Sequence, residues 1–159
     1  MPRYEVSHVY SAVMSGVSVS AAQDLFALTP VGHAITIHRI EVGQDASETS
    51  ENLPIQLRRG TGATAGSGGS AVTPNRLTPG ARAATTTVAR NNTTAEVAGS
   101  GTLLVLSRRA FNVVSGYVYA PAPEEKIRIN PGETFTVHLP SAPGGALTMS
   151  CEIVFEESV

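Results

Sequence analysis

The sequence predicts an all-β fold, a single antiparallel β-sandwich or jelly roll of about 8–11 strands. Apolar residues come in short runs separated by Gly, Pro, Ser, Thr and Asn, which is typical of strands joined by turns. Hydrophobic residues make up 42% of the chain and charged residues 15%. A chain of 159 residues has the size of one domain, so we treat residues 1–159 as a single β-sandwich. Within it, residues 1–16 are a candidate N-terminal arm and residues 60–79 a candidate mobile glycine-rich loop.

Five candidate strands lie in the N-terminal half, at residues 4–13, 17–20, 25–28, 34–42 and 55–59. In the fourth, Ile35 and Ile37 share one parity whereas Ile40 and Val42 share the other, so a regular strand cannot bury all four. A β-bulge near His38 and Arg39 would reconcile them. The helix signal is nearly absent, and only residues 20–24 and 78–84 are each compatible with a single helical turn.

The C-terminal half continues the strand pattern. Residues 102–107 are apolar on both faces, which favours a central strand, whereas residues 116–119 end before Pro121 and favour an edge strand. Residues 126–130 form a short strand, and the sequence from Asn130 to Glu133 predicts a turn with Pro131 and Gly132 at its two central positions. Residues 134–139 and 147–155 alternate apolar and polar, and the Pro- and Gly-rich segment between them predicts a hairpin with a long loop.

Composition argues against several classes of partner. The formal net charge is −2 and the pI about 6.1, so neither nucleic acid nor a membrane is expected. The N-terminus has no apolar leader, and no stretch approaches the ~18 apolar residues of a membrane span. We therefore expect a soluble protein made in the cytosol. Cys151 is the one cysteine, and its parity within residues 147–155 predicts a packed thiol.

No pattern of residues predicts catalysis, a cofactor or a metal. His33 and His38 are five residues apart and fall on opposite faces of a regular strand, so a cupin-type metal enzyme is the weakest alternative. Whether His33, His38 and His138 converge stays open at this stage. Neither a Gly-x-Ser-x-Gly elbow nor a phosphate-binding Gly-Lys-Ser/Thr ending occurs. We expect no enzyme and no cofactor.

An interface between subunits is the expected site. Arg58-Arg59 and Arg108-Arg109 follow or end apolar strands, where one arginine of each pair can protect a strand edge and the other can bond across an interface. Tryptophan is absent, which weakens a sugar-binding interpretation, so aromatic residues are expected in the core or an interface. The candidate interface residues are Tyr4, Tyr10, Arg59, Arg109, Tyr117 and Tyr119.

The chain also resembles a group of short proteins of tailed bacteriophages and prophages. The resemblance spans most of the chain and rests on residues 21–28, 67–74, 90–95, 110–113 and 131–133 and on the C-terminal Glu-Ile-Val-Phe-Glu-Glu. It carries no catalytic residues. It implies a virion protein similar to capsid decoration (cement) proteins, which bind the outer surface of the assembled head. The implied partners are other copies of the chain, with a trimer as the expected homo-oligomer, and the major capsid protein. A tail or fibre-tip module that binds a host glycan or receptor is the alternative.

Overall fold

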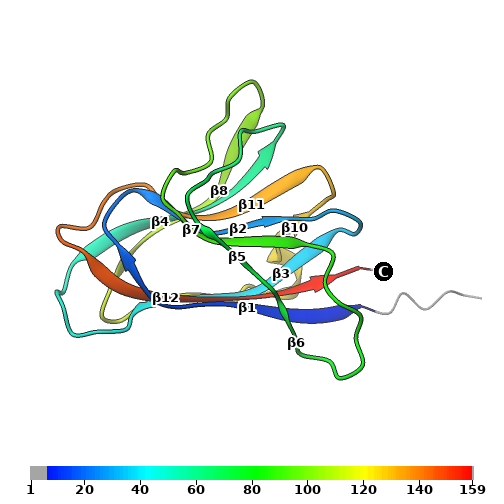
Figure 1. Cartoon of the computed structure of the whole chain (residues 1–159), viewed down its shortest axis with the longest axis horizontal. Coiled ribbons are helices and arrows are strands. Elements are labelled where there is room, and N and C mark those ends of the chain that lie inside the picture. Colours follow the sequence, from blue (N-terminus) through cyan, green and yellow to red (C-terminus); the bar gives the residue numbers. More distant parts are fainter. Residues whose placement is uncertain (1–6, 159) are drawn as a thin grey trace, which may run out of the picture.

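The computed structural model describes residues 7–158, which form an antiparallel β-sandwich of two six-stranded sheets (Figure 1). Sheet A has the order β10-β3-β12-β1-β6, with β9 also paired to β3, and sheet B has the order β5-β7-β2-β11-β4-β8. The fold class predicted from the sequence is confirmed. The strands are β1 (His8–Val19), β2 (Gln23–Thr29), β3 (Ile35–Gln44), β4 (Asn52–Thr61), β5 (Ser70–Val72), β6 (Asn75–Arg76), β7 (Thr87–Asn92), β8 (Thr102–Asn112), β9 (Tyr117–Tyr119), β10 (Arg128–Ile129), β11 (Glu133–Leu139) and β12 (Leu147–Glu157).

The chain passes back and forth between the two sheets. β1 lies in sheet A, β2 in B, β3 in A and β4 in B, and after β8 in sheet B the alternation resumes with β9 and β10 in A, β11 in B and β12 in A. Residues 62–101, here called the insertion, interrupt this path between β4 and β8. The insertion adds β5 and β7 beside β2 in sheet B and β6 beside β1 in sheet A. It therefore extends both sheets at the end away from β8.

The hydrophobic core lies between the sheets. On β11, Phe135, Val137 and Leu139 are buried and face this core, as successive side chains of a strand point to opposite faces. The ring of Tyr10 from β1 stacks on Phe155 from β12 with centroids 5.6 Å apart. Both rings are fully buried, so these two neighbouring strands are fixed by packing as well as by their backbone ladder.

Two local predictions are confirmed. The pairing of β3 with β12 shifts register between Ile37 and Arg39, so His38 is the bulged residue, and the bulge lets Ile37 and Ile40 both lie in the core. At the predicted turn, the Glu133 N–H donates to the carbonyl of Asn130 at 3.0 Å, and Gly132 has a φ of 88°. A positive φ at the second central position is what a type II turn requires of its glycine.

Other predictions were wrong. Residues 134–139 and 147–155 do not form a hairpin, because β11 lies in sheet B and β12 in sheet A. The strand at residues 102–107 is not central: β8 is the edge of sheet B and its apolar side chains are largely exposed. Of the predicted helical turns, residues 20–24 lead into β2 and residues 78–84 are irregular, and the one helical turn among residues 7–158 is a 3₁₀ turn, η1 (Pro123–Glu125).

The predicted arm and loop are partly built into the sheets. Residues 8–16 belong to β1 and pair with β12, while residues 1–6 lie outside the described part of the chain. Within the predicted glycine-rich loop, Gly60 and Thr61 end β4, and Thr64 and Ser67 form antiparallel bridges with Val97 and Thr94. The two arms of the insertion are thus tied to each other by backbone hydrogen bonds.

Candidate functional site

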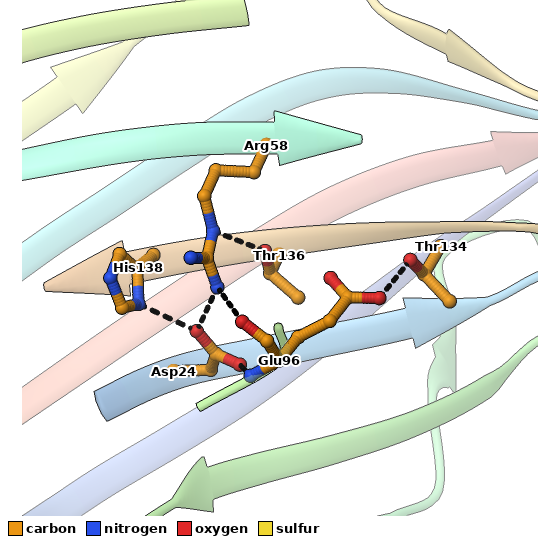
Figure 2. A network of polar contacts seen from close by, with 6 residues as sticks. All are labelled: Asp24, Arg58, Glu96, Thr134, Thr136 and His138. Atoms are coloured by element: carbon orange, nitrogen blue, oxygen red, sulfur yellow. Dashed lines mark hydrogen bonds and ion pairs between the residues drawn. The ribbon is translucent and has the colours of Figure 1, made fainter. Parts of the chain in front are cut away.

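A buried cluster of polar side chains lies on the face of sheet B that points away from the core. Thr134, Thr136 and His138 alternate along β11 with the three core residues, so they point to the opposite face. The insertion covers them there. Figure 2 shows how Asp24 from β2, Arg58 from β4 and Glu96 from the insertion meet these three side chains.

Asp24 is the centre of the cluster. Its Oδ1 accepts from Nη2 of Arg58 at 2.8 Å and lies 2.8 Å from Nδ1 of His138, and its Oδ2 accepts from the backbone N–H of Glu96 at 2.7 Å. Arg58 also donates from Nε to Oγ1 of Thr136 at 3.1 Å and from Nη2 to the carbonyl of Glu96 at 3.3 Å. These contacts join β2, β4 and β11 to the insertion (Figure 2). Removing one partner of such a buried ion pair leaves an uncompensated charge.

Glu96 is the least satisfied member of the cluster. Its side chain is almost fully buried, Oε1 accepts from the hydroxyl of Thr134, and Oε2 has no hydrogen-bond partner among the described residues. Burial, followed by the negative charge of Asp24, raises the pKa of Glu96, although the Thr134 hydroxyl and the Arg58 guanidinium oppose the rise. Burial also lowers the pKa of Arg58, against the opposing charges of Asp24 and Glu96. The cluster can therefore take up a proton at Glu96 more readily than a solvated carboxylate would.

A second buried carboxylate fastens the insertion to sheet A. Oε1 of Glu157, at the end of β12, accepts from the backbone N–H groups of Thr85 and Thr86 at 2.9 and 2.7 Å, and Oε2 accepts from Arg82 at 3.1 Å. The Arg82 carbonyl in turn accepts from the hydroxyl of Tyr10 at 3.0 Å. The cluster around Asp24 and the carboxylate of Glu157 thus hold the insertion at two separate points.

The histidines do not form a metal site. His33 contacts Arg82, His38 lies between Glu156 and Lys126, and His138 contacts Asp24. Across residues 7–158, no group of three or more His, Cys, Asp or Glu side chains could hold a metal ion.

The predicted interface residues are scattered. Tyr10 lies in the core and Tyr117 is buried, with its ring 6.0 Å from that of Phe111. The Arg59 side chain is one-third exposed and lies 3.9 Å from Glu133, and the hydroxyl of half-buried Tyr119 donates to the carbonyl of Glu125 at 3.1 Å. Arg109 is exposed, and Tyr4 lies outside the described residues. For all six residues, a role in an interface between subunits stays a prediction.

An exposed apolar surface lies along β8 and the segment that follows it. Five of the nine large hydrophobic residues exposed among the described ones come from this stretch: Leu104, Val105, Leu106, Val114 and Val118. β8 and β9 are edge strands of different sheets, and a groove of about 560 Å³ runs between them. We call β8, β9, η1 and this groove the open side of the sandwich. Sequence reasoning missed it because it took the apolar residues of β8 as a buried strand.

The comparisons with known proteins do not assign the chain to a family. No protein-family model matches the chain, and neither the curated proteins nor the solved structures include one that is similar to it. In the part of the chain that the structure describes, no helix is long and apolar enough to cross a membrane.

Proposed function

We propose that this chain is a structural protein of a bacteriophage virion, a decoration protein that binds the outer surface of the assembled head and stabilises it. The observation that supports this proposal best is the open side, where exposed apolar residues gather along two strand edges. Large apolar patches on soluble proteins mark surfaces that bind other macromolecules. A subunit that bridges neighbours in a shell needs such surfaces on a rigid frame.

The strand path supports the same role. Without the insertion, the remaining strands can be numbered from 1 to 8 in chain order: β1 to β4 are 1 to 4, β8 is 5, β9 and β10 together are 6, β11 is 7 and β12 is 8. In this numbering the spatial order is 1-8-3-6 in sheet A and 2-7-4-5 in sheet B. This order fits a jelly roll, a fold of viral capsid proteins that lectins and cupins also use. Because a fold does not determine function, the path supports the proposal without deciding it.

The polar clusters fit a structural role as well. Asp24, Arg58 and His138 direct their polar atoms at one another and at the insertion, and Glu157 is engaged by four donors of residues 85 and 86 and by Arg82. These hydrogen bonds and ion pairs hold residues 62–101 on the sandwich.

Co-sedimentation with phage heads that lack decoration protein tests the proposal. The purified chain should bind such heads saturably, with a fixed number of copies per capsid, and should leave intact bacterial cells unbound. Binding to cells or to their surface glycans, with no binding to heads, would favour the tail or fibre-tip alternative and contradict the proposal.

A further inference from the structure

The open side carries opposite charges on its two rims. Arg109 of β8 lines one rim of the groove and Glu125 of η1 lines the other, and both side chains are exposed. Within residues 7–158 neither forms an ion pair. The groove therefore has a basic rim and an acidic rim whose charges are free to meet a partner.

The groove has a mixed polar and apolar lining, and the strand beside it exposes large apolar side chains. Phe111 and Tyr117 pack against each other within the groove, and Val118 is 64% exposed at its border. Farther along β8, Leu104 and Val105 are each 51% exposed. Consecutive residues of a strand point to opposite faces, so a partner that covers both must lie against the strand edge. An exposed edge with this composition would favour association.

The size of the open side suits a stable contact between two proteins. An eleven-residue strand such as β8 spans about 36 Å at ~3.3 Å per residue. Two sheets packed ~10 Å apart, with the side chains on their outer faces, give a side about 20 Å wide. The resulting footprint of roughly 700 Å² is close to the ~800 Å² that each partner buries in a standard interface.

We propose that the open side is the contact between two copies of this chain, related by a two-fold axis that runs along the groove. Such an axis exchanges the rims, so that Arg109 of each copy faces Glu125 of the other and the exposed apolar edge of β8 lies along β9 and η1 of the other copy. In an isologous contact each residue pair occurs twice, which doubles the effect of one complementary pair. The inference rests on the assembly role proposed above: the open side joins two copies of the subunit, and the capsid would then be bound by other surfaces of the dimer.

Charge reversal with rescue tests this contact. The mass of the purified chain is measured by sedimentation equilibrium, and the wild type should form a species of twice the 16.5 kDa chain mass. Arg109→Glu alone and Glu125→Arg alone each place like charges opposite each other twice, and each should raise the dissociation constant at least about tenfold. The combined variant restores opposite charges and should recover the dimer. Arg76→Glu, on exposed β6 at the other end of sheet A, is the matched control and should leave the mass unchanged.

A second pair of variants tests the apolar contribution. Leu104→Ser should weaken the dimer, whereas Leu77→Ser, at a residue that is 53% exposed beside β6, should not. A wild type that stays monomeric at about 100 µM, where contacts of standard size are normally occupied, would overturn the proposal. So would a stable trimer, or a combined variant that remains as weak as the single ones. Because these masses are measured without phage heads, a dimer that ignores heads contradicts the proposed function alone, and a monomer that binds heads contradicts this inference alone.

Discussion

The unsatisfied carboxylate of Glu96 should make the protein less stable as the pH rises. Its pKa is raised in the folded state by burial and by the charge of Asp24, so the folded protein holds this proton more tightly than the unfolded chain does. The contribution of the proton to stability is full below the ordinary glutamate pKa of 4.5 and is lost as the pH rises toward the higher folded value. Above that value the folded state carries the whole cost of a buried charge.

Glu96→Gln removes the charge and can keep the hydrogen bond from Thr134. An unsatisfied buried charge costs more than the about 1–3 kcal/mol of an unsatisfied neutral group, and the amide of the variant still lacks a partner on one side, so the variant should gain roughly 1 kcal/mol at pH 8. A chain of this size should show a rise in Tm of roughly 2–4 °C for each kcal/mol. Near pH 4 the difference should shrink, because the wild-type carboxyl is then protonated as well.

Urea unfolding of both proteins between pH 4 and pH 8 measures this directly. Glu41→Gln, at an exposed residue of β3 whose ion pair with Arg39 is open to solvent and contributes little, changes net charge equally and should follow the wild-type curve. If the wild type and Glu96→Gln give parallel curves of stability against pH, the cost assigned to the Glu96 carboxylate is refuted.

Three further results are expected. Asp24→Ala should destabilise the fold by about 3–5 kcal/mol in chemical denaturation, because it leaves the buried guanidinium of Arg58 without its counter-ion; a loss below 1 kcal/mol would show that the pair is dispensable. Gly132→Ala should cost about 1 kcal/mol or more, since nothing lies near the added Cβ and only the φ of 88° opposes it; an unchanged Tm would contradict that backbone argument. Burial raises the pKa of the Cys151 thiol, so a thiol reagent should label the native protein far more slowly than the unfolded chain at pH 8, and equal rates would place this residue outside the core.

Parity within single strands was the reliable signal in the sequence. It placed the bulge near His38 and Arg39 and predicted the inward direction of Cys151, because both depend on neighbours within a few residues. It could not assign strands to sheets. β11 and β12 alternate just as hairpin strands do, yet the chain between them crosses the sandwich, and alternation shows which side chains are buried but not which strand lies alongside.

The sites depend on contacts between distant residues, which explains why the sequence did not reveal them. Asp24 and the backbone of Glu96 meet across 72 positions, and no local motif joins them. The polar row Thr134, Thr136 and His138 alternates with core residues as a solvent-facing row does, yet Thr136 and His138 are buried and Thr134 is partly buried under the insertion. For β8 the composition led to the wrong prediction of a central strand. Apolar residues on both faces are typical of a central strand, but they also occur on an edge strand that binds a partner.

The stability of the phage head itself tests the central claim most directly. Heads that lack decoration protein would be heated with and without the purified chain, and release of the packaged DNA followed by its accessibility to nuclease. The proposed function predicts that the chain raises the temperature of DNA release, and that the effect saturates when the binding sites on the capsid are filled. Release at the same temperature with and without the chain, under conditions where the chain is folded and in excess, would contradict it.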